Sequence, residues 1–132
     1  MGRASLRTPA MDVIHTAIEV ADLAATREFY EDGLGLSFDR EFTEDGIRNY
    51  YVSGEGGAGI QFRHDLDGVG PIEPVGIHHL ALEVDDLHAT FERLVELTDC
   101  AVVEEPTEDE DNRKAFVRDP DGYVVELLEF FD

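Results

Sequence analysis

The feature that most constrains this chain is an internal repeat. When the 132-residue sequence is aligned with itself at a shift of 64 positions, residues 15–28 fall on residues 79–92, and nine of the fourteen aligned pairs are identical. A repeat of this kind indicates a duplicated supersecondary unit that buries its apolar face against its twin. A chain of this length holds two such units around one core, which excludes a multidomain protein.

Each copy predicts the same order of elements. The alternating runs at residues 13–20 and 77–84 have the period of two that is typical of a β-strand. A helix is expected after each run, because Asp22 and Asp86 stand where an N-cap carboxylate accepts the free amides of the first turn. Three short strands are expected after each helix, at residues 37–42, 48–53 and 58–63 in the first copy and at residues 101–104, 114–118 and 123–130 in the second.

The order β-α-β-β-β, present twice, predicts an α+β fold. We expect a single domain at residues 11–132, with one module at 11–66, a Gly- and Pro-rich linker at 67–76 and a second module at 77–132. Residues 1–10 are expected to be a flexible N-terminal segment, because they lack the apolar stretch of a secretory signal.

The repeat also pairs residues that can bind a metal ion. His15 and His79 occupy equivalent points of the two copies, and Gln61 corresponds to Glu126 at an offset of 65, which one inserted loop residue explains. A pseudo-twofold packing of the two copies would bring these four residues to one place. Glu126 lies in an apolar run, where an unpaired buried carboxylate would cost several kcal/mol. A metal ion would compensate that charge, whereas a glutamate facing water would need a weakly buried sheet.

Two imidazoles, an amide oxygen and a carboxylate form a borderline-hard ligand set. Such a set suits a divalent ion, namely Ni²⁺, Co²⁺, Mn²⁺, Fe²⁺ or Zn²⁺, and the sequence does not choose among them. His78 is excluded as a ligand, because the register of the repeat pairs His79 with His15 and places His78 on the opposite face of the strand.

Several motifs resemble the vicinal oxygen chelate superfamily, to which glyoxalase I belongs. They are residues 14–23, Phe29-Tyr30 and residues 33–36 in the first copy, and residues 76–84 and 119–127 in the second. The resemblance spans about residues 11–131. It implies two tandem βαβββ modules in a curved eight-stranded mixed sheet, with the metal held by His15, Gln61, His79 and Glu126.

The resemblance further implies a metal-dependent lyase or isomerase of the glyoxalase I (lactoylglutathione lyase) type, acting on the hemithioacetal of a 2-oxoaldehyde. Glu126 would be the catalytic carboxylate that takes a proton from one carbon and returns it to the next. One position departs from the family pattern. The usual bacterial glyoxalase I offers two carboxylates to the metal, whereas this chain has Gln61 in place of one of them.

Three other functions stay open at this point. The His/Gln/His/Glu set and residues 76–86 also resemble methylmalonyl-CoA epimerase, for which Glu44 or Glu41 would be the second acid/base group. Two histidines and a carboxylate are typical of extradiol dioxygenase iron sites. The same fold also serves non-catalytic proteins that bind small molecules. An anionic substrate tail would have several candidate partners, each equally explained as surface charge: Arg27, Arg48, Arg63, Arg113 and Lys114.

The net charge of the chain limits the kinds of partner that it can bind. Ten Lys and Arg residues against 31 Asp and Glu residues give a net charge of −21, which disfavours binding to nucleic acid or to an anionic membrane. The acidic residues are spread over the chain, which indicates a solvated acidic coat and a halophilic host, because salt screens their repulsion. A single cysteine and the absence of a long apolar run favour a cytoplasmic protein. We expect a small-molecule substrate and a homodimer, although one chain or two could close the metal site.

Overall fold

The structure is a computed structural model, and it describes residues 13–131 of the chain. The segment at residues 1–10 that was expected to be flexible lies outside the described residues. In chain order, the elements are β1 (His15–Glu19), α2 (Leu23–Arg27), η1 (Glu28–Gly33), β2 (Ser37–Glu44), β3 (Ile47–Ser53), β4 (Gly59–Asp65), β5 (Leu80–Glu83), α3 (Leu87–Thr98), β6 (Val102–Glu108), β7 (Asn112–Arg118) and β8 (Val124–Phe130).

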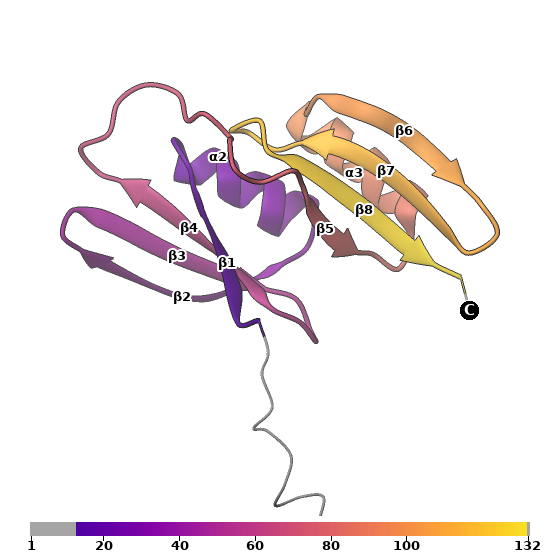
Figure 1. Ribbon diagram of the computed structural model, residues 1–132, viewed down its shortest axis with the longest axis horizontal. Coiled ribbons are helices and arrows are strands. Elements are labelled where there is room, and N and C mark those ends of the chain that lie inside the picture. Colours follow the sequence, from indigo (N-terminus) through magenta and orange to yellow (C-terminus); the bar gives the residue numbers. More distant parts are fainter. Residues whose placement is uncertain (1–12, 132) are drawn as a thin grey trace, which may run out of the picture.

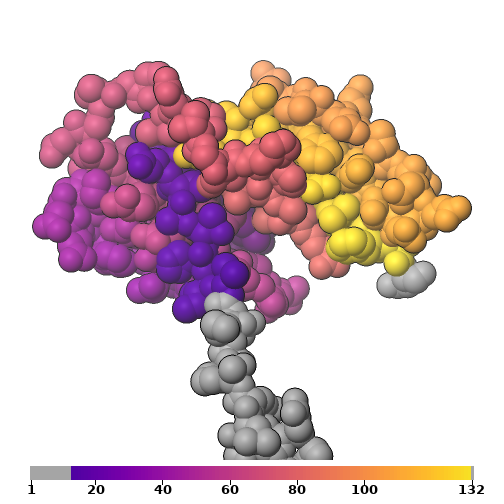
Figure 2. Space-filling model, viewed as in Figure 1, coloured from indigo at the N-terminus to yellow at the C-terminus, as the bar shows by residue number. Residues whose placement is uncertain are grey.

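The predicted α+β class is confirmed, and the strands form two four-stranded sheets (Figure 1). Sheet A has the order β1-β4-β3-β2 and sheet B the order β5-β8-β7-β6, each with one parallel pair followed by antiparallel pairs. The single eight-stranded sheet that the resemblance implied is therefore divided in two. The division arises because the copies meet through η1 and α3 and through a turn, and no strand ladder joins the two sheets among the described residues. Figure 2 shows the two copies side by side.

The strand registers reproduce the repeat. Ala17 pairs with Gln61 in sheet A, and Ala81 pairs with Glu126 in sheet B. The predicted inserted residue lies in the β6–β7 hairpin: Arg40 pairs with Tyr51, eleven positions on, whereas Glu104 pairs with Phe116, twelve positions on. The two copies thus present equivalent residues at equivalent points of their sheets.

Each sheet has one buried and one open face. Side chains such as Ile18, Phe62 and Leu127 form the core together with Phe29 and Leu94 of the helical segments. The alternate residues point to the other side, which we call the open face of each sheet. In sheet A it carries His15, Ala17, Arg40, Tyr51 and Gln61; in sheet B it carries His79, Ala81, Lys114, Phe116 and Glu126.

The predicted helix starts are confirmed. Asp22 Oδ1 accepts a hydrogen bond from the Ala25 amide at 3.2 Å, and Asp86 Oδ1 accepts one from the Ala89 amide at 3.1 Å. The first helix then widens into the π-helical turn η1, which nothing in the sequence predicted. No helix within residues 13–131 is long and apolar enough to cross a membrane.

The turn at residues 119–123, between β7 and β8, joins the second copy to the first. Asp121 Oδ1 accepts a hydrogen bond from the Ala21 amide at 2.9 Å, and the Tyr123 hydroxyl donates to the Glu19 carbonyl oxygen at 3.1 Å. Both acceptor and donor groups of the first copy lie at the end of β1. The turn therefore holds the end of β1 in place from the other module.

Asp119 is the buried centre of this junction. Its Oδ2 accepts a 2.7 Å hydrogen bond from the Tyr30 hydroxyl of η1, and its Oδ1 accepts from the amides of Asp121 and Tyr123. Burial raises the pKa of the Asp119 carboxyl from 3.8 to about 6, although these hydrogen bonds oppose the shift. The junction is thus well hydrogen-bonded, but ionisation of the buried Asp119 carboxyl costs free energy.

The close approach of η1 to α3 depends on Gly33. A Cβ atom at Gly33 would lie 2.5 Å from Cδ1 of the fully buried Leu94. We expect Gly33→Ala to lower the free energy of unfolding by about 1–3 kcal/mol, because the buried leucine cannot move without strain. Chemical denaturation measures this change. Gly57→Ala is the control, since a Cβ atom there meets nothing within 4 Å, and an equal effect of both variants would contradict the explanation.

The raised pKa of Asp119 predicts a pH-dependent contribution to stability. The folded protein holds the Asp119 proton up to about pH 6, whereas the unfolded chain releases it near 3.8. The contribution is therefore complete below about pH 4 and is lost as pH rises through 6. Relative to Asp119→Asn, we expect the wild type to lose at most about 3 kcal/mol between pH 4 and pH 7. Parallel pH profiles of unfolding for the two proteins would contradict this.

Candidate metal centre

The first pair of predicted ligands, His15 and Gln61, lies on the open face of sheet A. β1 and β4 are parallel neighbours, and Gln61 is in register with Ala17, two residues after His15. Both side chains are half-buried. Tyr51 of β3 is in register with Gln61 of β4. Its ring packs edge-on against the His15 ring, with the ring centroids 5.3 Å apart. The pair therefore stands on adjacent strands against an aromatic wall.

A neighbouring asparagine orients Gln61. Asn49 Nδ2 donates to the Ile47 carbonyl oxygen at 3.1 Å, so Asn49 Oδ1 is left as the acceptor. Gln61 Nε2 donates to that oxygen at 2.8 Å. The amide nitrogen of Gln61 is thus occupied, and its Oε1 atom remains for another partner. An amide oxygen held in this way suits a divalent metal ion, because only the oxygen of the amide can be a ligand.

The second pair, His79 and Glu126, lies on the open face of sheet B. His79 Nε2 and Glu126 Oε1 are 3.3 Å apart, and their side chains are 32% and 14% exposed. Phe116 pairs with Glu126 across β7 and packs edge-on against the His79 ring at 5.9 Å. The arrangement repeats that of the first pair. The aromatic residues were missed by sequence reasoning, although the offset of 65 that relates Gln61 to Glu126 also relates Tyr51 to Phe116.

His78 does not behave as the strand alternation predicted. It was expected to point to the opposite face, but its Nδ1 atom lies 2.8 Å from Nδ1 of His79. Both histidines precede β5, so the alternation of the strand does not yet apply to them. A hydrogen bond between the two Nδ1 atoms leaves His79 Nε2 on the side of Glu126.

The two pairs do not form one cluster within a single chain. Among residues 13–131 no group of three or more His, Cys, Asp or Glu side chains lies close enough together to hold a metal ion. Since His15, His79 and Glu126 would form such a group, the first pair is separate from the second. The physical reason is the contact between η1 and α3, which joins the copies through their helical sides.

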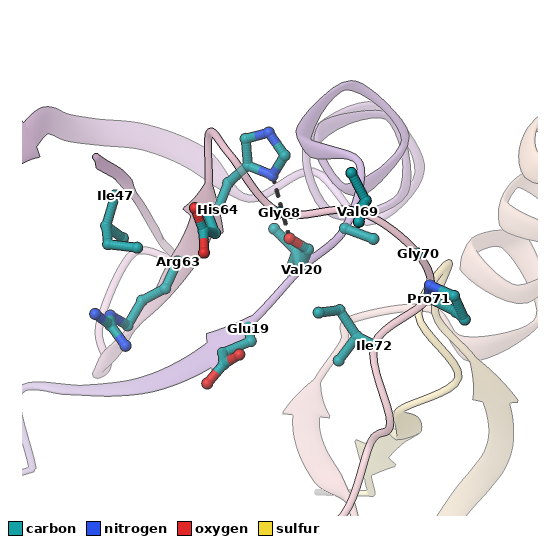
Figure 3. A pocket seen from close by; sticks show the side chains of 12 residues that line it. Glu19, Val20, Ile47, Arg63, His64, Gly68, Val69, Gly70, Pro71 and Ile72 are labelled. Carbon is teal, nitrogen blue, oxygen red and sulfur yellow. Dashed lines mark hydrogen bonds between the residues drawn. The ribbon is translucent and has the colours of Figure 1, made fainter. Parts of the chain in front are cut away.

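A pocket of about 310 Å³ lies at the C-terminal ends of β1 and β4, at the opposite end of β1 from His15 (Figure 3). It is lined by the ends of β1 and β4, including Glu19, Arg63 and Asp65, and by residues 68–72 of the linker. Arg63 follows Gln61 by two residues, so both side chains belong to the open face. None of the four predicted ligands lines the pocket itself.

Two βαβββ modules, each with a histidine in or just before the first strand and a Gln or Glu in the last, define a recognisable class of fold. A sequence model of the Glyoxalase/Bleomycin resistance protein/Dioxygenase superfamily matches residues 13–127. The chain belongs to this superfamily.

Known proteins similar to this chain include two enzymes and, by fold alone, a binding protein. The chain is 34% identical to a lactoylglutathione lyase of Haemophilus influenzae, over 90% of this chain and 93% of that protein. It is 25% identical to the trypanothione-dependent glyoxalase I of Leishmania major, with a TM-score of 0.78 over 91% of this chain and 87% of the other. An antibiotic-binding protein from Streptomyces sp. CB03234 shares the fold, with 24% sequence identity and a TM-score of 0.73. The alignment covers 95% of this chain and 100% of that protein.

The hydrogen bond from Gln61 to Asn49 predicts a measurable effect on metal affinity. Asn49→Ala frees the Gln61 amide to rotate, so we expect the affinity for a divalent ion to fall about tenfold, as for other residues that orient metal ligands. Competition with a chelator measures the affinity. Asn112→Ala is the matched control, because Asn112 is the only other asparagine of the chain and lies at the far end of β7. Equal affinities of Asn49→Ala and the wild type would contradict the role of Asn49.

Proposed function

We propose that this protein is a divalent-metal-dependent lyase of the glyoxalase I type, which converts the hemithioacetal of a 2-oxoaldehyde and a thiol into a 2-hydroxyacyl thioester. The observation that supports it best is the pair of equivalent half-sites, His15 with Gln61 and His79 with Glu126, at matching registers of the two sheets. The lactoylglutathione lyase of Haemophilus influenzae supports the same reaction class, since the likeness extends over nearly the whole of both chains.

We further propose that two chains complete each site. In this arrangement His15 and Gln61 of one protomer face His79 of the partner subunit and Glu126 of the partner subunit. The open faces suit such an assembly, because no helix within residues 13–131 covers them and they carry apolar side chains such as Phe42, which is 38% exposed. A symmetric dimer would contain two identical sites of this kind. The modules at residues 11–66 and 77–132 would then be the units that pair across the dimer.

The four residues fit a divalent ion by the chemistry of their donor atoms, and a bound ion would supply Lewis-acid stabilisation of negative charge on the substrate oxygens. The sequence and the geometry leave the choice open among Ni²⁺, Co²⁺, Mn²⁺, Fe²⁺ and Zn²⁺. His15, His79 and the Oε1 atom of Gln61 would hold it. Glu126 is the fourth ligand and the residue that we assign to proton transfer.

The reaction moves one proton between adjacent carbons. Glu126 takes the proton from the carbon that carries the sulfur and the hydroxyl, and returns it to the neighbouring carbonyl carbon. The hydroxyl proton moves to the other oxygen, so that a thioester and a secondary alcohol result. Glu126 is the single carboxylate of the proposed set, and its 14% exposure beside Phe116 limits the access of water.

The epimerase alternative needs a second acid/base group, and neither candidate lies near the half-site. Glu41 lies on the opposite face of β2, where its Oε2 atom accepts from Arg48 Nη2 at 2.8 Å. Glu44 is on the open face but at the end of β2, two strands across from Gln61 and four residue pairs along the sheet, which is about 13 Å in the strand direction alone. The positions of both glutamates favour the glyoxalase I reaction over epimerisation.

The acidic composition supports a proposal about the cell compartment and the host of the protein. Because the net charge of −21 is spread over both copies, salt would be needed to screen its repulsion. We propose a cytoplasmic protein of a halophilic host, and assays should therefore be run at high salt.

Mixed dimers of inactive variants test the shared site. His15→Ala and Glu126→Gln are each expected to be inactive with a hemithioacetal substrate. A mixture of the two chains in equal amounts should regain about one quarter of the wild-type activity, because half of the dimers are mixed and each holds one intact site. The matched control is a mixture of His15→Ala with Gln61→Ala, which damages the same half-site and should regain nothing. Equal recovery in both mixtures, or none in the first, would contradict a site shared between chains.

Elemental analysis of the purified protein completes this test. We expect one divalent ion per chain, and loss of activity when a chelator removes it. If the protein held no stoichiometric metal and Glu126→Gln changed only the affinity for a ligand, the enzyme proposal would be replaced by non-catalytic binding of a small molecule.

A further inference from the structure

His79 of the second half-site lies between two polar partners. Its Nε2 atom is 3.3 Å from Oε1 of Glu126, and its Nδ1 atom is 2.8 Å from Nδ1 of His78. Phe116 packs edge-on against the same ring, with the ring centroids 5.9 Å apart. Each ring nitrogen of His79 therefore faces one partner. The position of the single ring proton of a neutral histidine depends on both partners.

The carboxylate favours a tautomer of His79 that cannot bind a metal ion through Nε2. An ionised carboxylate only accepts hydrogen bonds, so Glu126 stabilises the tautomer that carries its proton on Nε2. The side chain of Glu126 is 14% exposed, which limits the access of water that could donate in place of His79. Without a further partner, the second half-site would keep its histidine in the form that donates to Glu126.

His78 favours the opposite tautomer. Of two Nδ1 atoms that lie 2.8 Å apart, one must donate a hydrogen bond and the other must accept it. If His79 is the donor, its proton lies on Nδ1, and its Nε2 atom carries the lone pair that a metal ion needs. Histidines that bind metal ions in proteins usually donate their other ring N–H to a nearby acceptor. The Nδ1 atom of His78 can be this acceptor.

The two copies differ at the position of His78. At the repeat shift of 64, the residue before His15 is Ile14, which is 78% exposed and has no polar side-chain atom. The first half-site also has the neutral Gln61 where the second has Glu126. Of the two copies, the one whose carboxylate competes for the proton of its histidine ligand is thus the one with a second histidine beside that ligand.

From these contacts we propose that His78 is a positioning residue of the second half-site. Its Nδ1 atom accepts the Nδ1 proton of His79 and so selects the tautomer that can bind a metal ion through Nε2. The inference rests on the proposed metal-dependent function. The same tautomer releases Oε1 of Glu126 from its contact with a His79 proton, so the carboxylate is free for the proton transfer assigned to it.

NMR spectra of the imidazole rings test the proposal on the full-length protein. Two-bond 1H–15N correlations show which nitrogen of each ring carries the proton. The chain has five histidines, so the signals of each ring are assigned from the variant that lacks it. In the metal-free protein we expect the proton of His79 on Nε2. With Zn²⁺, which is diamagnetic, we expect it on Nδ1 of His79, together with an unprotonated Nδ1 atom in His78.

Two substitutions of His78 separate the acceptor atom from the rest of the side chain. The Oδ1 atom of an asparagine is as many bonds from the backbone as the Nδ1 atom of a histidine, whereas a leucine has a similar shape and no acceptor. We expect His78→Leu to lower the affinity for Zn²⁺ about tenfold, measured by competition with a chelator. His78→Asn should restore most of the affinity. Both variants should fold, because His78 is exposed.

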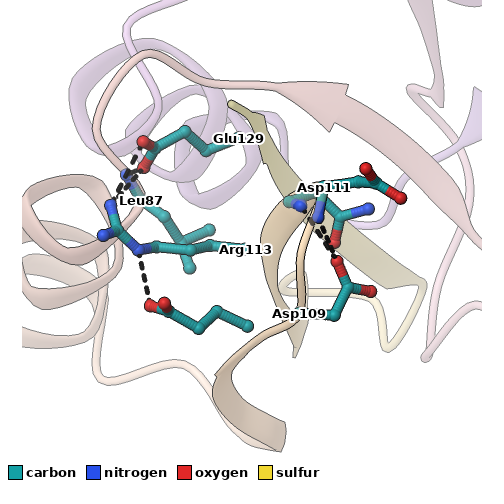
Figure 4. Close-up of polar contacts among 7 residues, drawn as sticks. Leu87, Asp109, Asp111, Arg113 and Glu129 are labelled. Atoms are coloured by element: carbon teal, nitrogen blue, oxygen red, sulfur yellow. Dashed lines mark hydrogen bonds and ion pairs between the residues drawn. The ribbon is translucent and has the colours of Figure 1, made fainter. Parts of the chain in front are cut away.

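The matched control is His88→Leu, which removes an exposed histidine from the other side of the same module. His88 follows Leu87 in the first turn of α3, where the Leu87 amide donates to Glu129 Oε1 at 2.9 Å (Figure 4). Arg113 pairs with the same carboxylate at 3.2 Å. These contacts hold the start of α3 on the helical side of sheet B, so His88→Leu should bind Zn²⁺ as the wild type does.

Three results would overturn the proposal. Equal Zn²⁺ affinities of His78→Leu and the wild type would show that His78 does not position His79. Equal losses of affinity in His78→Leu and His78→Asn would show that the acceptor atom is not the cause. A metal-bound signal from a ring nitrogen of His78 would make this residue a ligand.

The wild-type protein separates this inference from the proposed reaction. If it bound Zn²⁺ with the expected ring protons but converted no hemithioacetal with any of the candidate ions, the inference would stand and the glyoxalase I reaction would be refuted. If it converted the hemithioacetal and His78→Leu bound Zn²⁺ equally well, the inference alone would fail. Absence of Zn²⁺ binding by the wild type would refute both.

Discussion

The buried hydrogen bond between the Tyr30 hydroxyl and Asp119 is the interaction on which the arrangement of this protein depends. It holds a turn of the second copy against the π-helical turn of the first, together with the bonds of Asp121 and Tyr123 to the end of β1. Because the copies are joined in this way through turns and helices, each sheet keeps one face that no helix of residues 13–131 covers. The predicted metal ligands and the two aromatic walls lie on those faces.

The sequence predicted what depends on local periodicity and on duplication. The alternation of apolar residues located the strands, and Asp22 and Asp86 marked the helix starts, because a cap acts within three residues. The repeat paired Gln61 with Glu126, and the strand registers place both at equivalent points. These features are recoverable from sequence since each is set by neighbours in the chain or by comparison of one copy with the other.

What the sequence could not predict depends on contacts between distant segments. Nothing in residues 28–33 distinguishes a π-helical turn from a helix end, and the close approach of Gly33 to Leu94 in α3 is visible only in the folded chain. The role of Asn49 requires the register of β3 against β4. Arg40 resembles any surface arginine until its position over Tyr51 is known. In each case the role of the residue depends on a tertiary contact that the sequence does not show.

The two half-sites have diverged in charge, and their neighbours have diverged with them. Gln61 is neutral and is oriented by Asn49, whereas the equivalent positions of the second copy hold Glu126 and Lys114, at the same offset of 65. An amide needs a hydrogen-bond partner to choose which of its atoms faces a metal ion, while a carboxylate presents oxygen in either orientation and needs no such partner. In the first copy a hydrogen bond thus orients the neutral side chain of Gln61. The second copy has Lys114 at the position of Asn49, one residue pair on the same face away from Phe116, which is in register with Glu126. Duplication therefore accounts for two similar half-sites, and in the proposed reaction the first would contribute a neutral amide ligand and the second the carboxylate that is assigned to proton transfer.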